Sequence, residues 1–440
     1  MRTVGIGIVG LGTVGGGTVR VLLDHRDQYL ESYGIDVEVV RACSLEASDA
    51  ERLGLADGVW TADWHDVVSD ERVDIVIEVI GGEHPATEIY ETAFAAGKHV
   101  VTANKALLGK KVATFAKEAH DAGVQLRCEA ACAGGIPIVS TLEHDFIGNK
   151  ILTIAGIMNG TTNYILSRMT DEGGEFEDVL ADAQAAGYAE ADPTADVDGF
   201  DAASKIALLA SMGFRTRVTT DDVYMQGIRK VSAADIEQAK SLGYSVKLLA
   251  IARATDAGVD VRVHPTMIPQ SHQLAAVSGA MNAVYVVGDA IGETMFYGAG
   301  AGSFPTASAI VGDVLGVADH IAHGVEPTPE KEPFDRVLPI LSIDDLETNF
   351  YVRLLVEDRA GTLAGVADVF ARRGISIKSM NQLGSDADGA CSVVFLTHTV
   401  RDADLRAATD ELAGLDSVRE VASVIRIEDI DAWTEGMFAN

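Results

Sequence analysis

"TVGIGIVGLGTVGGGTVRVLL", the stretch from Thr3 to Leu23, decides the fold of the amino-terminal part of the chain. An apolar run of strand length leads into three glycines with G-x-G-x-x-G spacing, Gly10, Gly12 and Gly15, and apolar residues then recur at helical intervals. Gly10 permits a tight turn, Gly12 lets the backbone approach a pyrophosphate, and Gly15 lets the helix lie close to the strand. The strand before the glycines and the helix after them distinguish this pattern from a flexible loop. It therefore predicts a dinucleotide-binding turn with the anion at the helix N-terminus.

Further apolar stretches continue the alternation of strand and helix. Strand-like segments occupy residues 36–44, 73–81 and 99–105, and a helix-like segment occupies residues 86–97. This alternation predicts an α/β domain with a doubly wound parallel sheet of the Rossmann type, whose ligand lies at the carboxyl ends of the strands. Gly81 and Lys105 follow two of the predicted strands, so both are candidates for the site.

The end of the second predicted strand bears on the choice of cofactor. An acidic residue there would bind the ribose 2′-hydroxyl of NAD, whereas an arginine would accept the 2′-phosphate of NADP. Arg41, Ser44 and Glu46 are all in range. Arg41 either receives a 2′-phosphate or points away within the strand, so the residues favour NADP and leave NAD open.

The acidic composition argues against two classes of partner. The formal net charge is -32 over 440 residues, and only 12 of the 34 basic residues are lysines. Self-repulsion of this size keeps a chain soluble and disfavours nucleic acids and anionic membranes as partners. An acidic, lysine-poor surface also suits a cytoplasm rich in salt, where screening is strong. The composition therefore predicts a halophilic source.

Other features predict a cytoplasmic location. No apolar run reaches the roughly 18 residues that a membrane-spanning helix needs. The start of the chain also lacks the basic and long apolar regions of a signal peptide. The four cysteines show neither zinc nor disulfide spacing, which is typical of packed thiols in a reducing compartment.

A dense acidic stretch, "GYAEADPTADVDGFDAASK", occupies residues 187–205 and ends in a lysine. Asp201 and Lys205 are four residues apart, so on a helix they share one face. Apolar residues follow at the spacing of a buried helix face. One interpretation is an exposed ion pair worth about 0.3–0.5 kcal/mol, and the other is a reaction centre.

Six stretches, taken in order, resemble one enzyme family. They are residues 10–17 (GLGTVGGG), 102–105 (TANK), 129–138 (EAACAGGIPI), 156–166 (GIMNGTTNYIL), 187–205 and 297–313 (YGAGAGSFPTASAIVGD). Together they are similar to homoserine dehydrogenase across residues 1–320. The resemblance implies reversible NAD(P)-dependent interconversion of L-homoserine and L-aspartate 4-semialdehyde, a step towards threonine, methionine and isoleucine.

The resemblance also implies roles for single residues. Lys205 resembles the lysine that transfers a proton in the family. Asp201 and Glu190 resemble its homoserine-binding acids, with Asp196 nearby. Lys105 resembles a second site lysine that lies close to both the nicotinamide and the substrate. These implications favour the reaction centre over the exposed ion pair for residues 187–205.

The glycine pattern and the resemblance together imply a cofactor-binding set. It comprises Gly10, Gly12, Thr13, Val14, Gly15, Lys105, Gly187 and Gly302. The resemblance further implies a structural sodium ion, held by the Glu129 carboxylate and by the backbone carbonyls of Cys132, Gly134 and Ile136. An ordinary Gly-Gly-Ile-Pro turn is the alternative interpretation of this stretch.

Residues 156–166 open a second, α+β domain for catalysis and dimerisation. Asn159 to Thr162 are predicted to form a turn before a helix, with Thr162 or Asn163 as its N-cap. Strands are predicted at residues 259–268 and 283–289. The family resemblance implies a sheet that pairs across a dimer, so a homodimer or homotetramer is expected.

A third domain follows a proline-rich, charged linker. Residues 349–427 predict the order β-α-β-β-α-β of a ferredoxin-like fold. Residues 356–366, "VEDRAGTLAGV", resemble an ACT domain, which implies amino-acid binding, with threonine as the first candidate effector. Asp358, Gly361 and Asn381 are the candidate ligand contacts, and a dimerisation module without ligand is the alternative. Removal of this module is expected to leave the dehydrogenase reaction intact.

The predicted division of the chain has four parts. They are an NAD(P)-binding domain at 1–135 to which 300–320 returns, a catalytic and dimerisation domain at 136–323, a linker at 324–347 and an ACT domain at 348–430. Two rival functions remain. A different dehydrogenase of small amino or hydroxy acids would lack the 187–205 stretch, and a non-catalytic amino-acid sensor would leave Lys105 and Lys205 unexplained. A fused kinase is not expected, because the dehydrogenase motifs begin at residue 1.

Overall fold

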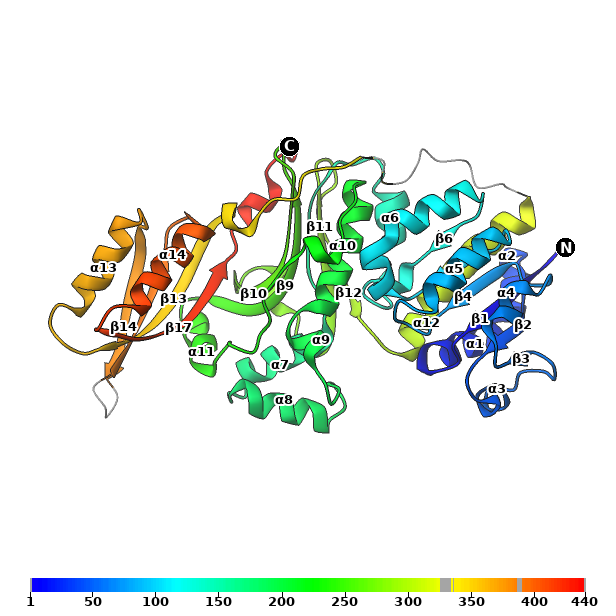
Figure 1. The fold of residues 1–440 in the computed structure, drawn as a ribbon, viewed down its shortest axis with the longest axis horizontal. Helices are drawn as coiled ribbons and strands as arrows, with labels where there is room; N and C mark the ends of the chain where they lie inside the picture. Colours follow the sequence, from blue (N-terminus) through cyan, green and yellow to red (C-terminus); the bar gives the residue numbers. More distant parts are fainter. Residues whose placement is uncertain (1, 325–333, 335, 386–389, 439–440) are drawn as a thin grey trace.

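The computed structural model describes residues 2–324, 334, 336–385 and 390–438, which form three domains in a row (Figure 1). Much of the predicted linker lies outside these residues. The dinucleotide-type domain is at one end of the molecule and the ferredoxin-like domain is at the other. The second domain lies between them, and the carboxyl terminus returns to it (Figure 1).

The first domain contains a parallel sheet with the strand order β3-β2-β1-β4-β5-β6. Its strands are β1 (Thr3–Val9), β2 (Asp36–Cys43), β3 (Trp60–Thr61), β4 (Ile75–Glu78), β5 (His99–Thr102) and β6 (Leu126–Arg127). Its helices are α1 (Thr13–Asp24), α2 (Arg26–Tyr33), α3 (Ala47–Arg52), α4 (Trp64–Ser69), α5 (Ala86–Ala95) and α6 (Lys105–Asp121). The order reverses between β1 and β4, and a ligand of such a sheet binds at that point.

The second domain combines a mixed sheet with helices. Its strands are β7 (Ile151–Ile157), β8 (Tyr224–Met225), β9 (Tyr244–Ala254), β10 (Val259–Pro269), β11 (Met281–Gly288) and β12 (Gly292–Ala299). Its helices are α7 (Gly160–Asp171), α8 (Phe176–Ala185), α9 (Thr194–Val197), α10 (Phe200–Phe214) and α11 (Ala233–Ser241). Helix α10 is buried along most of its length, because its own alanine, isoleucine and leucine side chains are apolar on several faces. Burial of these side chains fixes the position of the charged residues at its start.

Helix α12 (Ser303–His323) leaves β12 and packs against the first domain. Its buried residues Ile310, Val314 and Val317 belong to the same apolar core as β1 and α1. At the start of the helix, Ser303 Oγ donates a hydrogen bond of 2.7 Å to the carbonyl of Thr13. The start of α12 is thereby tied to the glycine-rich turn.

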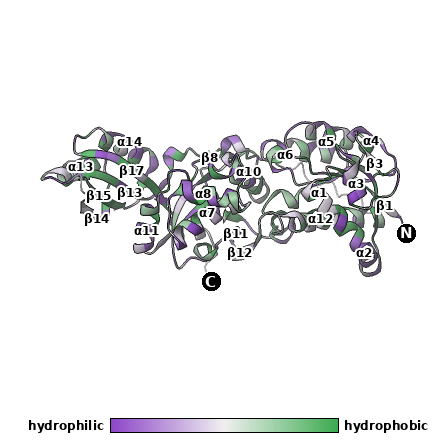
Figure 2. Cartoon of the chain, turned by 90° about the horizontal axis from the view of Figure 1, so that it is seen from below, coloured by the Kyte–Doolittle hydropathy of each residue, from purple (hydrophilic) through white to green (hydrophobic). Residues whose placement is uncertain are grey.

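The third domain has the predicted ferredoxin-like order. It contains β13 (Glu347–Glu357), α13 (Thr362–Arg372), β14 (Ile377–Ser385), β15 (Ala390–Thr397), β16 (Val400–Arg401), α14 (Asp402–Ala413) and β17 (Val418–Ile427). The sheet order β17-β13-β15-β14 places the last strand beside the first. Hydrophobic residues lie along β13 and β15 and line the core of this domain (Figure 2). The predicted fold class, with its Rossmann, α+β and ACT domains, is confirmed.

One continuous sheet joins the second and third domains. β17 pairs in parallel with β10, through Thr266 opposite Arg426 and Met267 opposite Ile427. The path β12-β11-β7-β9-β10-β17-β13-β15-β14 therefore runs through both domains. Beyond β17, Trp433 is fully buried, and Thr153 of β7 donates a hydrogen bond to its carbonyl. The sequence patterns did not predict this attachment. In the described residues, no helix is both long and apolar enough to cross a membrane.

Candidate active site

The glycine-rich turn has the geometry of a phosphate cradle. Gly10 adopts a φ of 108°, which favours glycine. A Cβ on Gly15 would lie 1.9 Å from the carbonyl oxygen of Gly10, so only glycine allows this contact. A Cβ on Gly12 would meet nothing within 4 Å. Gly12 is the N-cap residue of α1, so the open space lies at the positive end of that helix.

Apart from Lys105, the other predicted cofactor residues lie in two places. Thr13 and Val14 form the first turn of α1, next to Ser303. Gly302 precedes Ser303 with a φ of 124°, so it lies beside the glycine-rich turn. Gly187 follows α8 in the second domain with a φ of 79°. The structure therefore brings Gly302 to the turn and keeps Gly187 on the loop that leads to Glu190.

Asp201 brings two lysines together. Its Oδ2 lies 2.6 Å from Lys205 Nζ, one turn further along α10. Its Oδ1 lies 3.3 Å from Lys105 Nζ at the start of α6. The exposed fractions of the side chains are 8% for Lys205, 10% for Asp201 and 42% for Lys105. The cluster is therefore a buried carboxylate and lysine with a second lysine at the solvent side, and the exposed ion pair is ruled out.

The charges in this cluster keep Asp201 ionised. Burial by itself would raise the pKa of Asp201, but the ammonium groups of Lys205 and Lys105 outweigh it and lower the pKa to about 2. Lys205 Nζ also donates to the carbonyl of Met158 at 2.7 Å. An ammonium has three N–H donors, so one donor of Lys205 remains after Asp201 and Met158. That donor is available for an oxygen of a substrate.

Asn159 is a site residue that the sequence patterns missed. Its Nδ2 donates to Asp201 Oδ2 at 2.9 Å and to Asp196 Oδ1 at 2.7 Å. Its Oδ1 accepts from Thr162 N at 2.8 Å and caps α7. The prediction of Thr162 or Asn163 as N-cap was wrong, because the helix already begins at Gly160. Asparagine is itself a preferred N-cap residue, and its place two residues after β7 and just before the helical pattern is the signal that would have identified Asn159.

Glu190 lies apart from the lysine cluster. Its side chain is exposed in the loop between α8 and α9. That loop is tied down, because Gln184 Nε2 donates to the Glu190 carbonyl at 2.8 Å and Thr161 Oγ1 donates to the Tyr188 carbonyl at 2.8 Å. The second contact connects the loop to α7. The structure therefore places Asp196 next to Asp201, through Asn159, and leaves Glu190 facing solvent.

Glu129 has a hydrogen-bonding role that the sodium prediction did not include. Its Oε1 accepts from the backbone N–H groups of Ile138 (2.7 Å) and Val139 (2.9 Å), and its Oε2 accepts from Ser140 N at 2.8 Å. The carboxylate therefore caps the start of the following helical turn. The turn itself reverses at Ala133 and Gly134, whose φ angles are 54° and 56°.

Arg41 points away from the end of β2. Its Nε lies 3.1 Å from Asp70 Oδ2, and its Nη1 donates to the carbonyl of Gly58 at 2.5 Å. The guanidinium is thus engaged at the side of the sheet where α4 ends. Of the two alternatives for Arg41, the structure supports the one in which it does not face the ribose.

The predicted effector residues occupy two elements of the third domain. Asp358 and Gly361 lie in the exposed turn between β13 and α13, where Gly361 adopts a φ of 95°. A Cβ on Gly361 would meet nothing within 4 Å. Asn381 lies on β14, which is separated from β13 by β15. Asp358 and Gly361 therefore share one turn, and Asn381 is on another strand.

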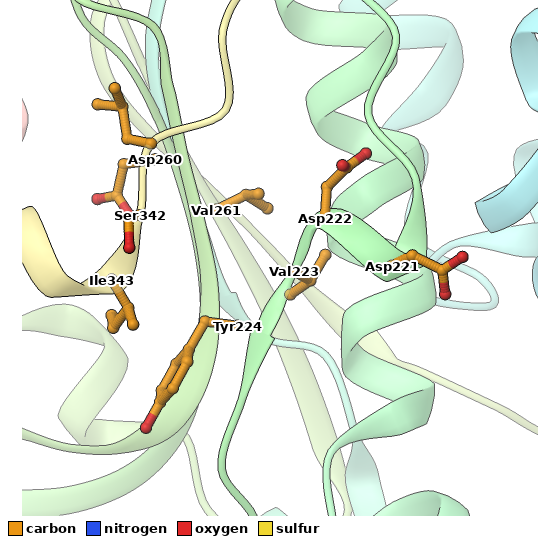
Figure 3. Close-up of a pocket in the computed structure, with 9 residues that line it drawn as sticks. Asp221, Asp222, Val223, Tyr224, Asp260, Val261, Ser342 and Ile343 are labelled. Atoms are coloured by element: carbon orange, nitrogen blue, oxygen red, sulfur yellow. The ribbon is translucent and has the colours of Figure 1, made fainter.

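A separate recess of about 220 Å³ lies between β8, β10 and residues 341–343 (Figure 3). It carries three carboxylates, Asp221, Asp222 and Asp260, and none of the predicted site residues. Asp222 accepts a hydrogen bond from Thr219 Oγ1 at 2.7 Å. Asp260 pairs with the buried Arg262. The recess is therefore distinct from the lysine cluster, and two of its carboxylates already have partners.

Three sequence families match the chain in order. They are "Homoserine dehydrogenase, NAD binding domain" at residues 10–129, "Homoserine dehydrogenase" at residues 137–315 and "ACT domain" at residues 350–416. The curated homoserine dehydrogenase of Synechocystis sp. is 46% identical over 435 residues, which are 97% of this chain and 99% of the relative. That of Corynebacterium glutamicum is 44% identical over 97% of this chain and 96% of its own length. The chain belongs to the homoserine dehydrogenase family.

Solved structures agree with this membership. A homoserine dehydrogenase from Thiobacillus denitrificans is 42% identical, covers 98% of this chain and 99% of its own, and superposes with a TM-score of 0.91. The Staphylococcus aureus homoserine dehydrogenase at pH 7.5 is 32% identical over 98% of this chain and 100% of its own, with a TM-score of 0.77. This homoserine dehydrogenase is therefore an NAD(P)-dependent oxidoreductase, and the two rival functions are set aside.

Proposed function

We propose that Lys205 is the residue of this homoserine dehydrogenase that transfers the proton, and that Asp201 and Lys105 complete its catalytic group. The observation that carries the proposal is the buried contact of 2.6 Å between Asp201 and Lys205, with one N–H of Lys205 unused by the protein. In the reductive direction this N–H donates to the aldehyde oxygen of the semialdehyde. In the oxidative direction the unprotonated amine of Lys205 takes the proton from the hydroxyl of homoserine and becomes the ammonium.

The nicotinamide, when bound, supplies or accepts the hydride. The glycine-rich turn fits such a cofactor, because Gly12 leaves open space at the N-terminus of α1. Lys105 begins α6 at the end of β5, on the half of the sheet beyond the switch point. We place Lys105 between nicotinamide and substrate, where its partly exposed ammonium orients the substrate oxygen.

We further propose that Asp196, beside the cluster, and Glu190, on the loop between α8 and α9, bind the amino group of the substrate. The Asn159 amide donates to both Asp196 and Asp201 and so holds the two carboxylates close together. Glu190 is exposed on the loop beside α7, so its carboxylate can contact a ligand. A carboxylate pair binds an ammonium through charge-assisted hydrogen bonds. Gly187, at the start of the same loop, would allow close approach of the cofactor.

We propose that the enzyme uses NADP, with NAD as the alternative. Arg41 does not support it, but Arg52 does. The Nη2 of Arg52 lies 3.4 Å from the carbonyl of Leu11 in the glycine-rich turn, and the side chain is largely exposed. A hyperthermophilic archaeal homoserine dehydrogenase in complex with NADPH is 25% identical over 72% of this chain, with a TM-score of 0.62. Arg52 ends α3, the helix after β2, and pairs with Asp49 at 3.1 Å. An arginine beyond the second strand is the chemistry that a 2′-phosphate requires.

Three further features belong to the proposal. A sodium ion at Glu129 fits the oxygen-only donor set, because Oε2 accepts a single N–H and keeps a lone pair. The ACT domain binds an amino acid at the turn with Asp358 and Gly361, and threonine is the first candidate for that amino acid. The chain forms homo-oligomers, and its division into domains follows the boundaries 1–135, 136–323, 324–347 and 348–430, with 300–320 in the first domain.

We propose that the acidic surface is an adaptation to salt. We also propose that the reaction belongs to the biosynthesis of threonine, methionine and isoleucine. Turnover and thermal melting together test the proposals on salt and on the nucleotide. NAD(P)H formation from L-homoserine is measured with each nucleotide, in dilute and in molar KCl, with and without threonine. The proposals predict faster turnover with NADP and a higher Tm in molar salt. Turnover and Tm that do not change with salt would remove the halophilic explanation, and equal rates with the two nucleotides would remove the preference for NADP.

A further inference from the structure

Glu78, the last residue of β4, is a fully buried carboxylate that the reaction described so far does not use. Its Oε1 accepts from the backbone N–H groups of Ile80 at 2.9 Å and Gly81 at 3.1 Å. These two residues form the turn that leaves the strand. The carboxylate therefore fixes the path of the chain at the carboxyl end of β4, which is the ligand-binding edge of the sheet.

The second oxygen of Glu78 fixes the neighbouring strand. Its Oε2 accepts from Thr102 Oγ1 at 2.9 Å, from Tyr90 Oη at 2.7 Å and from Asn104 Nδ2 at 3.3 Å. In each of these contacts the partner of Glu78 can donate a hydrogen bond, and an ionised carboxylate can only accept. Five groups that can donate therefore surround the carboxylate, an arrangement that suits its ionised form. In the described part of the chain, no lysine, arginine or histidine forms an ion pair with it.

Asn104 transmits this arrangement to Lys105. The Asn104 amide also donates to the carbonyl of Gly82 at 2.7 Å, and its Oδ1 accepts from Leu107 N at 3.1 Å and caps α6. Lys105 is the next residue and the first of that helix. Glu78 is thus connected through one side chain to the backbone that carries Lys105.

A buried charge without a counter-ion is costly, so its retention calls for a reason. An uncharged glutamine could accept from the same backbone N–H groups. In a sheet with this strand order a dinucleotide would cross at the switch point between β1 and β4, and its nicotinamide half would bind near the ends of β4 and β5. The oxidised nicotinamide ring is a cation and the reduced ring is neutral. A negative charge beneath it therefore favours the oxidised form.

We propose that Glu78 is a positioning residue of the dehydrogenase, which fixes Gly81 and Lys105 through its hydrogen bonds and makes the site prefer the oxidised nucleotide through its charge. The first part rests on the placement of Lys105 in the active site. The second part concerns nucleotide affinity and can be measured without turnover.

The test is direct binding of oxidised and reduced nucleotide to Glu78→Gln, Tyr90→Phe and Glu91→Gln variants. Glu91 is an exposed acid on α5, so Glu91→Gln removes the same charge away from the site. Glu78→Gln is expected to weaken binding of the oxidised nucleotide relative to the reduced one by about tenfold. Tyr90→Phe keeps the charge and should keep the ratio of the two affinities, while lowering kcat because Glu78 and Thr102 lose a hydrogen-bond partner. Glu91→Gln should change neither quantity.

Two results would overturn the proposal. An unchanged affinity ratio in folded Glu78→Gln would remove the role of the charge, and an equal change in Tyr90→Phe would attribute the effect to geometry alone. If Glu78→Gln does not fold, the double variant Glu78→Gln/Tyr90→Phe removes the hydroxyl that would confront the new amide, and it is expected to show the same altered ratio. A Glu78→Asp variant retains the charge, so it should keep the ratio and lose turnover. A lost ratio in Glu78→Asp would contradict the charge argument.

Discussion

The carboxylate of Asp201 and the ammonium of Lys205 lie one helical turn apart on α10, with 2.6 Å between Oδ2 and Nζ. Both side chains are buried, which separates this pair from an exposed helix ion pair of the same spacing. Removing one partner of a buried pair leaves an unpaired charge and costs roughly 3–5 kcal/mol. Asp201 has Lys105 as a second partner, so loss of Lys205 leaves its charge compensated.

Replacement of Lys205 by alanine should therefore leave a folded enzyme with little activity. Loss of a positioned proton-transfer group is expected to lower kcat by roughly 10²-fold or more. Nucleotide affinity should stay near that of the parent chain, because Lys205 belongs to the second domain. Ser204→Ala, at the preceding position, is the matched control and should keep its activity. Near-normal turnover in folded Lys205→Ala would sink the assignment.

Asn159 allows its two roles to be separated by choice of substituent. Asn159→Ala removes both the cap of α7 and the bonds to Asp196 and Asp201, so it should lose about 1 kcal/mol of stability together with activity. Asn159→Asp keeps a capping oxygen but places a third carboxylate beside the other two. We expect it to lose kcat/KM and also to lower the Tm, because the new carboxylate repels Asp196 and Asp201. Full activity in Asn159→Asp would show that the amide does not organise the site.

Sequence patterns predict the local features of this site but miss the contacts between separate elements. The glycine spacing identifies a tight turn, because glycine is required there by the backbone alone. The helical spacing places Asp201 and Lys205 on one face for a similar local reason. The contact of Asp201 with Lys105, and that of Glu78 with Tyr90 and Thr102, depend on how separate elements pack. Such contacts leave no local pattern, and neither does the pairing of β10 with β17.

Glu190→Gln should weaken binding of homoserine and leave nucleotide affinity unchanged. A hydrogen bond to a charged group contributes about 1.5–3 kcal/mol, so KM is expected to rise about tenfold or more. Asp192→Asn is the matched control in the same loop, because asparagine can still accept from Thr194 N as Asp192 does at 3.1 Å. Steady-state kinetics with homoserine as the varied substrate measure both variants. If KM and kcat of Glu190→Gln match those of the parent, Glu190 is not in the site.

His99 predicts a loss of stability in mild acid. Burial lowers the pKa of His99 to about 4, against the opposing charge of Asp74. Above pH 6.5 the imidazole is neutral in both states, and between pH 6.5 and about 4 only the unfolded chain takes up a proton, so stability falls as pH falls. The effect is on the order of 1–2 kcal/mol, since the ring is partly exposed.

Melting curves at pH 7 and pH 5 measure this effect. His99→Asn preserves an acceptor for Gln125 N, which bonds to Nδ1 at 3.0 Å, and it should reduce the difference in Tm between the two pH values. His398→Asn, an exposed histidine on the third domain, should leave that difference as in the parent. Equal pH dependence of the parent and His99→Asn would contradict the prediction.

Deletion of the ACT domain should destabilise this enzyme, although the sequence suggested a separable module. Truncation before residue 340 would expose the edge of β10 that pairs with β17. It would also remove Trp433 from the core it shares with β7 and β9. Arg426 would be lost from its contacts with Asp402 (2.6 Å) and with Gln226 of the second domain (3.0 Å). We therefore expect a lower Tm and reduced activity in the truncated chain, measured by thermal melting and by turnover.

Control by threonine is better tested in the intact chain. Threonine at the turn after β13 should raise the Tm and lower the rate, with a coupling of about 1–3 kcal/mol. The physical route is short, because β17 is bonded to β10, and Gln226 N donates to the carbonyl of Val263 in β10 at 2.8 Å. Ile228, two residues after Gln226, bonds to Val197 beside Asp196 at 2.8 Å. Asp358→Asn should abolish the response to threonine and keep the uninhibited rate. A response that persists in Asp358→Asn would move the effector site elsewhere, and no response in the parent chain would leave the ACT domain as an assembly element.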